Sequence, residues 1–264
     1  MSDTRSLFLE EMGLTRWQLR IQTTKADQEA EPVEANPPLA ADAALPPAVT
    51  PAPVLPASAF REALSPTLAR QAEIARMDWE TLEAASRNCS ACGLCQMRKQ
   101  AVPGVGDRHP DWLFIGEGPG AEEDAQGEPF VGQAGKLLDA MLASIGLRRG
   151  NRVYIANAVK CRPEGNRTPH PDEMATCRPF LQRQIALLQP RLIVLLGKAA
   201  MHSVLGEDRS LASMRQRIWH YEHIPVLVTY HPAYLLRNLP EKIKVWEDLC
   251  LARRTMAQQS TTTG

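Results

Sequence analysis

Four short apolar runs alternate with segments of helical periodicity, and this alternation limits the fold more than any other feature of the chain. The predicted strands are Trp112–Glu117, Val153–Val159, Leu192–Gly197 and Val226–Tyr230. The predicted helices between them are Gly135–Ile145, Asp172–Leu188 and Lys198–Leu205. Strands that alternate with helices are typical of a parallel sheet covered on both faces, so the pattern predicts an α/β domain.

Composition divides the chain into four parts. Residues 1–24 contain an amphipathic stretch, and residues 25–64 form an Ala- and Pro-rich segment that we expect to be a disordered linker. Residues 65–257 have the mixed pattern of a globular domain, and residues 258–264 are expected to be a disordered tail. The chain has no run of about eighteen apolar residues and no signal-peptide pattern, so we expect a cytoplasmic protein without a membrane span.

Unusual residues follow the predicted strands, at the edge where ligands of parallel sheets bind. Gly116-Glu-Gly-Pro-Gly120 follows the first strand, Asn157 lies near the end of the second, and His231 follows the last. The glycines would let the backbone approach a ligand closely, although Gly-Pro-Gly is usually only a turn. Neither the Rossmann nor the P-loop fingerprint is present.

Several of these residues allow both a structural and a functional interpretation. Phe130 could pack in the core or offer a stacking face for a base. Asn157 could be satisfied by backbone groups or could read a pyrimidine edge, because its amide both donates and accepts. His231 could be structural, and Leu235-Leu236-Arg237 could be an amphipathic turn or an apolar wedge beside a cation that unstacks bases.

Clustered cysteines indicate a metal site more than disulfides in a reducing compartment. Cys89 and Cys92 form a C-x-x-C pair, and Cys161 and Cys177 could complete a set of four thiolates. Cys95 creates a competing pair with Cys92, so spacing alone does not choose between them. Spacing also does not separate an iron–sulfur cluster from a zinc ion.

Five ordered segments together resemble the family 4 uracil-DNA glycosylases, the iron–sulfur members of the uracil glycosylase superfamily. They are Cys89-Ser-Ala-Cys92-Gly-Leu94, Gly116-Glu-Gly-Pro-Gly-Ala-Glu-Glu-Asp124, Pro129-Phe-Val-Gly132, Asn157-Ala-Val-Lys-Cys-Arg-Pro163 with Cys177, and His231-Pro-Ala-Tyr-Leu-Leu-Arg-Asn238. The resemblance implies a three-layer α/β/α sandwich with a central four-stranded parallel sheet. It also implies an enzyme that flips uracil out of single- or double-stranded DNA and hydrolyses its N-glycosidic bond, the first step of base excision repair.

The resemblance assigns roles to individual residues of the pocket. Phe130 would stack on the uracil, Asn157 would read its polar edge, and His231 would donate to the uracil oxygen that gains charge. Gly116 and Gly118 would contribute to the pocket floor.

Further implied roles concern the attacking water, the DNA and a cofactor. Glu117 or Glu123 would orient the water, or no residue would. The residues that would enter the duplex are Leu235, Leu236 and Arg237. A [4Fe–4S] cluster would be held by Cys89, Cys92, Cys161 and Cys177.

Residues 6–20 resemble the start of the psi subunit of the bacterial clamp loader, which implies a tether to replication proteins. The alternative is a helix packed on the enzyme's own domain. We expect a monomer. Two other interpretations of the whole chain stay open, namely a non-catalytic iron–sulfur DNA-binding module and a zinc-stabilised hydrolase of another substrate. Covalent trapping of DNA is not expected, because Lys160–Pro169 lacks an inserted basic loop.

Overall fold

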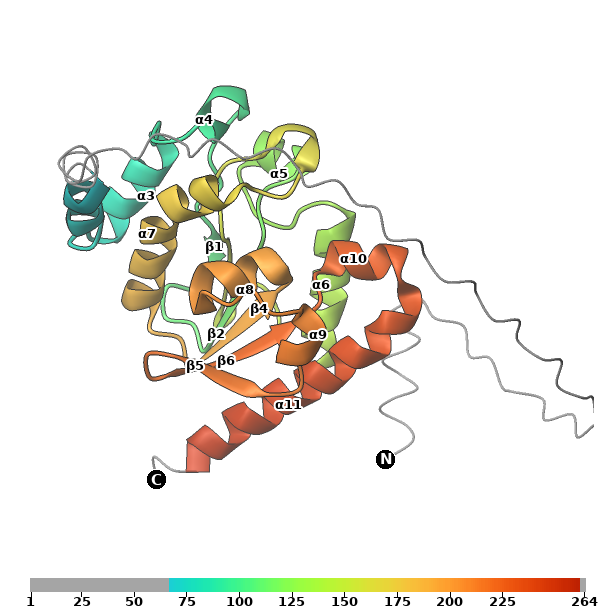
Figure 1. The fold of residues 1–264 in the computed structure, drawn as a ribbon. Helices are drawn as coiled ribbons and strands as arrows, with labels where there is room; N and C mark the ends of the chain where they lie inside the picture. Colours follow the sequence, from blue (N-terminus) through green and yellow to red (C-terminus); the bar gives the residue numbers. More distant parts are fainter. Residues whose placement is uncertain (1–66, 262–264) are drawn as a thin grey trace, which may run out of the picture.

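A six-stranded sheet, ordered β1-β3-β2-β4-β6-β5, forms the centre of the part of the chain that the computed structural model describes, residues 67–261 (Figure 1). The N-terminal peptide and the whole predicted linker lie outside these residues, so the disordered linker and the clamp-loader contact stay predictions. The four inner strands are parallel and every residue in them is buried. They are β2 (Trp112–Gly116), β3 (Val153–Asn157), β4 (Leu192–Leu196) and β6 (Ile224–Thr229).

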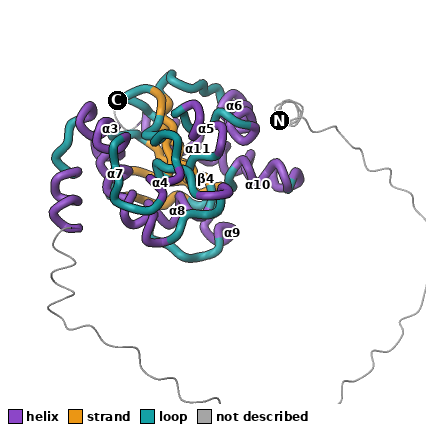
Figure 2. Tube along the Cα trace, turned by 90° about the horizontal axis from the view of Figure 1, so that it is seen from above, coloured by secondary structure: helices purple, strands orange, loops and turns teal. Residues whose placement is uncertain are grey.

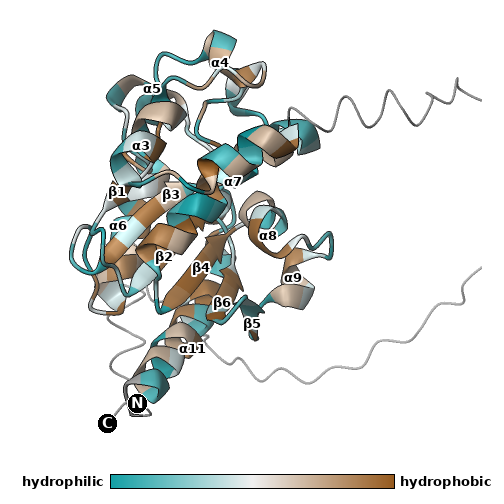
Figure 3. Cartoon of the chain, turned by 90° about the vertical axis from the view of Figure 1, so that its left-hand side faces the viewer, coloured by the Kyte–Doolittle hydropathy of each residue, from teal (hydrophilic) through white to brown (hydrophobic). Residues whose placement is uncertain are grey.

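These inner strands confirm the predicted parallel sheet, and the two edge strands add to it. β1 (Val105–Gly106) and β5 (Ile218–Tyr221) pair antiparallel with their neighbours. Both are short and only partly buried, so neither has the continuous apolar run that marks the inner strands. Figure 3 shows the strongly hydrophobic colour of β2, β4 and β6.

Alternate side chains of each inner strand point to opposite faces, and helices cover both (Figure 2). Trp112 and Phe114 of β2 pack with α6 (Gln133–Ser144) and α11 (Lys242–Thr261). Leu113 and Ile115 pack with α7 (Pro171–Leu188) and α8 (Lys198–Leu205). The result is the expected three-layer arrangement.

Shorter elements surround the sheet. The remaining helices are α3 (Trp79–Arg87), α4 (Leu94–Met97), α5 (Ala121–Gln126), α9 (Leu211–Met214) and α10 (Pro232–Arg237), with 3₁₀ turns η1 (Glu164–Asn166) and η2 (Leu239–Glu241), and residues 67–74 are also helical. Because α11 continues through Thr261, residues 258–261 are helical and are not part of the expected tail. Among the described residues, no helix is long and apolar enough to cross a membrane.

A buried ion pair fastens α11 to the loop that precedes β5. Arg215 Nε donates to Asp248 Oδ2 at 2.7 Å, and the side chains are 7% and 0% exposed. Thr229 Oγ1 and Gln216 Nε2 also donate to the Asp248 carboxylate, at 2.6 and 2.7 Å. Thr229 ends β6, two residues before His231, so this network fixes the backbone from which His231 projects.

We expect Asp248→Ala to lower the free energy of unfolding by about 3–5 kcal/mol, because Arg215 would be left as an uncompensated buried charge. Urea unfolding followed by circular dichroism measures the change. Glu83→Ala removes a half-buried partner of the exposed Arg87 at the surface and serves as the control, with an expected loss below about 1 kcal/mol. Equal losses of unfolding free energy in the two variants would show that the buried ion pair stabilises the fold no more than the surface pair does.

Candidate active site

A cavity of about 720 Å³ opens at the carboxyl edge of the inner strands. The loop after β2 lines it with Glu117 and Gly118, and β3 contributes Asn157. Phe130 comes from the connection between α5 and α6, and His231 follows β6. The structure therefore brings together the residues that the sequence analysis had placed in a pocket.

Asn157 presents an unpaired acceptor in this cavity. It is the last residue of β3 and is 1% exposed, and its Oδ1 has no hydrogen-bond partner among the described residues. A Cβ on Gly116 would lie 2.5 Å from this oxygen and 2.4 Å from Cζ of Phe130. Glycine is therefore required at position 116, between the amide and the aromatic ring. Because this oxygen belongs to a residue that lines the cavity, it is available to accept a hydrogen bond from a ligand or from water.

His231 is held as a neutral hydrogen-bond donor. Its Nδ1 accepts from the backbone N–H of Ala233 at 3.1 Å, which leaves the proton of the neutral ring on Nε2. Burial, and secondarily the charge of Arg237, lower the pKa of His231 to about 4. Its ring stacks on Phe130 with 5.4 Å between centroids. At neutral pH, Nε2–H can donate without bringing a full charge into the cavity.

Phe130 has a backbone conformation that side chains rarely adopt, with φ of 57°. Such conformations cost about 1–3 kcal/mol and persist only where the surroundings enforce them. The α6 backbone also approaches closely, because a Cβ on Gly135 would lie 1.8 Å from the Phe130 carbonyl oxygen. The loop therefore places the ring at the cavity by close packing against α6.

The two candidate carboxylates have different environments. Glu123 accepts from the N–H groups of Gly120 at 3.0 Å, Val131 at 2.9 Å and Gly132 at 3.1 Å. Both of its oxygens are engaged, so Glu123 braces the loop that carries Phe130. Glu117 lines the cavity, and burial raises its pKa, against a lowering effect of its hydrogen bond with Thr168. Glu117 is therefore the better placed carboxylate to orient a water.

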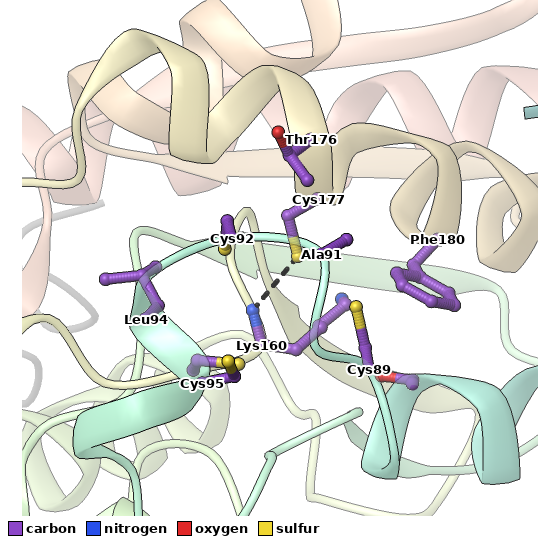
Figure 4. Close-up of a pocket in the computed structure, with 11 residues that line it drawn as sticks. Cys89, Ala91, Cys92, Leu94, Cys95, Lys160, Thr176, Cys177 and Phe180 are labelled. Atoms are coloured by element: carbon purple, nitrogen blue, oxygen red, sulfur yellow. Dashed lines mark hydrogen bonds between the residues drawn. The ribbon is translucent and has the colours of Figure 1, made fainter. Parts of the chain in front are cut away.

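A second pocket is lined by cysteine sulfurs. Figure 4 shows Cys89, Cys92 and Cys95, from the segment around α4, together with Cys177 of α7 at this pocket. Cys161, which follows β3, also lines it. Cys95 lines the same pocket, so the competing pair noted in the sequence stays possible. Among the described residues, no three such side chains lie close enough together to hold a single metal ion.

Cationic and backbone donors point at three of these sulfurs. Arg98 donates to Cys161 Sγ at 2.7 Å, Arg70 to Cys89 Sγ at 3.6 Å, and the Lys160 amide to Cys177 Sγ at 3.3 Å. Burial raises the pKa of Cys177 to about 12. Metal binding requires deprotonated thiols, and nearby N–H donors stabilise the thiolate form. The donor set would therefore suit a multinuclear cluster, whose thiolates stand farther apart than the ligands of a single ion.

Comparison with known proteins assigns the family. The family model described as the uracil DNA glycosylase superfamily matches residues 103–250. A type-4 uracil-DNA glycosylase of Pyrobaculum aerophilum is 39% identical over 183 residues, which span 66% of this chain and 93% of the relative. The chain belongs to the uracil-DNA glycosylase superfamily.

Within that superfamily the chain is similar to two types. A type-4 uracil-DNA glycosylase of Thermotoga maritima is 44% identical over 167 residues, 62% of this chain and 86% of the relative. A type-5 uracil-DNA glycosylase of Thermus thermophilus is 31% identical over 150 residues, 49% of this chain and 68% of the relative. The higher identity and coverage favour the type-4 enzymes, as the resemblance of the five ordered segments implies.

The predicted wedge of this glycosylase needs one correction. Leu235 is 0% exposed and packs in the core with α6 and α11, so its side chain does not face DNA. Leu236 is 42% exposed, and Arg237 lines the mouth of the cavity. Leu239, which the sequence analysis did not single out, is 46% exposed beside them. Leu236 and Leu239, on either side of Arg237 and Asn238 in the chain, are thus the exposed leucines of this segment.

Other pocket residues were missed because only the fold brings them there. Tyr230 and Lys198 line the cavity from the ends of β6 and β4. Gly197, with φ of 93°, packs against His231, since a Cβ there would lie 3.1 Å from Cβ of the histidine. The glycine after an apolar strand was the signal that could have indicated this close approach.

We expect the stability of the glycosylase to fall as the pH drops from about 6.5 toward 4. In this window the unfolded state binds a proton on His231, whose ordinary pKa is 6.5, whereas the folded state does not until about pH 4. Urea unfolding across this range should show a steeper loss for the wild type than for His231→Gln. His223→Gln, at an exposed position, should keep the wild-type slope. Parallel curves for all three proteins would contradict the buried neutral histidine.

Proposed function

We propose that this chain removes uracil from DNA by hydrolysing the N-glycosidic bond, with Asn157, His231 and Phe130 as its pocket. Asn157 and His231 line the same cavity, where Asn157 has a buried, unpaired Oδ1 and His231 has a neutral N–H donor. This pair of groups is the main support for the assignment. The N3–H of uracil can donate to Oδ1 of Asn157, and a carbonyl oxygen of uracil can accept from Nε2–H of His231. The Phe130 ring supplies the stacking face. The similarity to the type-4 uracil-DNA glycosylases of Pyrobaculum aerophilum and Thermotoga maritima supports the same activity.

The pocket chemistry also accounts for selectivity against cytosine. The N3 atom of cytosine carries no hydrogen, so Asn157 Oδ1 would stay unpaired beside it. A site built to bond a substrate N–H rejects an analogue that lacks it, because its own polar atom is left buried without a partner.

The proposed reaction proceeds by stabilising the departing base. As the bond to the sugar breaks, negative charge develops on the uracil ring, and Nε2–H of His231 donates to its oxygen. One such donor is worth about 3 kcal/mol in other enzymes. Glu117 holds the water that attacks the sugar, and Leu236 and Arg237 occupy the space that the flipped base leaves in the duplex.

We expect His231→Ala and Asn157→Ala each to slow single-turnover cleavage of uracil-containing oligonucleotides by about 100- to 1000-fold, because each removes a contact to the developing charge or to the base edge. Alkali cleavage of the abasic product provides the readout. Asn151→Ala and His223→Ala are exposed matched controls and should retain activity. A wild-type protein that binds DNA but never cleaves would favour the non-catalytic binding module.

A [4Fe–4S] cluster held by Cys89, Cys92, Cys161 and Cys177 completes the proposal. These four thiols line one pocket, and the N–H···S bonds from Arg98 and Arg70 suit a cluster whose sulfurs carry negative charge. When bound, the cluster supplies a covalent cross-link between chain segments and takes no part in the hydrolysis.

We expect the purified protein to be brown and to contain about four iron atoms, the content of one [4Fe–4S] centre. Cys92→Ala should lose iron and colour, because it removes a proposed ligand, whereas Cys95→Ala should keep both. Iron analysis and visible absorption measure the outcome. A colourless protein that contains zinc would contradict the cluster, and loss of iron in Cys95→Ala would reassign the ligands.

A further inference from the structure

Arg149 binds the backbone of the Phe130 loop, as Glu123 does, but through the carbonyl oxygens. It lies in the turn between α6 and β3, and its side chain is 26% exposed. Its Nη1 donates to the carbonyl oxygen of Pro129 at 2.9 Å, and its Nη2 donates to that of Phe130 at 2.5 Å. Nη2 also lies 3.5 Å from the carbonyl oxygen of Gly135. One guanidinium therefore joins the loop to the first turns of α6.

The guanidinium is itself oriented by α6. Asp139 forms an ion pair with Nε of Arg149. Asp139 and Gly135 are four positions apart on the helix, so they lie on the same face. The planar fork of arginine can donate to two carbonyls while it stays paired with a carboxylate, which the single ammonium of lysine cannot do in the same geometry.

The backbone of Phe130 needs such a constraint. Its φ of 57° is unfavourable for a bulky side chain. Glu123 accepts from the N–H groups of Val131 and Gly132, and Arg149 donates to the carbonyl oxygens of Pro129 and Phe130. The peptide between Phe130 and Val131 is therefore held at both its carbonyl and its N–H. Without Arg149 the peptide could return to an ordinary conformation, and the ring would leave its place 5.4 Å from His231.

We propose that Arg149 is a positioning residue of the glycosylase: it fixes the Phe130 ring in the orientation that stacks on the flipped uracil. This inference rests on the proposed function, because it takes Phe130 as the stacking surface. Arg149 touches neither base nor sugar and acts through the Phe130 backbone.

A double-mutant cycle tests this inference on the full chain with its cluster. Arg149→Ala should lower kcat/KM on uracil-containing single strands by about 10- to 100-fold, since a small misplacement of a positioning group has effects of this size. Inhibition by free uracil should weaken by a similar factor. In a Phe130→Ala background, Arg149→Ala should cause a further loss below about threefold, because the group it positions is gone. Arg149→Lys should recover only part of the activity.

Two controls separate positioning from general damage. Arg148→Ala changes the neighbouring exposed arginine and should leave kcat/KM and uracil inhibition unchanged. Hydrogen exchange measured by mass spectrometry should speed up in residues 129–132 of Arg149→Ala and stay unchanged in β2 and β4. This readout needs no enzymatic activity.

The experiments distinguish failure of the Arg149 positioning role from failure of the proposed glycosylase activity. Equal fold-losses for Arg149→Ala in the wild-type and Phe130→Ala backgrounds would overturn the positioning role. Unchanged uracil inhibition in Arg149→Ala, or unchanged exchange in residues 129–132, would overturn it as well. If the wild-type protein releases no uracil, the proposed function fails, and the exchange measurement alone decides whether Arg149 orders the loop.

Discussion

The parallel register between β2 and β3 is the constraint on which the cavity depends. It pairs Gly116 with Asn157 at the last rung of the two strands. Because Gly116 has no side chain, the ring of Phe130 and the amide of Asn157 can approach the same point from two directions. A shift of one residue would turn Asn157 to the other face of the sheet and remove the acceptor from the pocket.

The same strand also connects the cavity to the cysteine pocket. Asn157 ends β3, and Lys160 and Cys161 follow three and four residues later. The buried ammonium of Lys160 donates to the Asn157 carbonyl oxygen at 2.8 Å and to Oε1 of Gln184 at 2.6 Å. Gln184 in turn donates to the carbonyl of Pro103 at 2.9 Å. A metal centre bound through Cys161 would restrain the backbone on one side of this short segment, and the base would contact the other side. A cluster bound there and the cavity would therefore be parts of one rigid unit.

Much of this arrangement follows from local patterns in the sequence. The inner strands are continuous apolar runs, and the helix at Lys198–Leu205 has the predicted bounds. The edge strand Ile218–Tyr221 was not predicted, because a half-exposed strand does not carry such a run. Leu235 was misplaced, since periodicity in a short turn does not tell which of two adjacent leucines faces the core. The hydrogen bond from Arg149 to the carbonyl oxygen of Phe130 could not be predicted, because the direction of that carbonyl depends on the positive φ of Phe130.

We infer that the buried, unpaired acceptor on Asn157 selects uracil by its N3–H. This claim can be tested by single-turnover cleavage of oligonucleotides that carry either deoxyuridine or N3-methyldeoxyuridine. The wild type should cleave the methylated nucleotide at least about a thousandfold more slowly. In Asn157→Ala, which lacks the acceptor, the two rates should become similar. Comparable cleavage of both nucleotides by the wild type would contradict the claim, and so would an undiminished preference in Asn157→Ala.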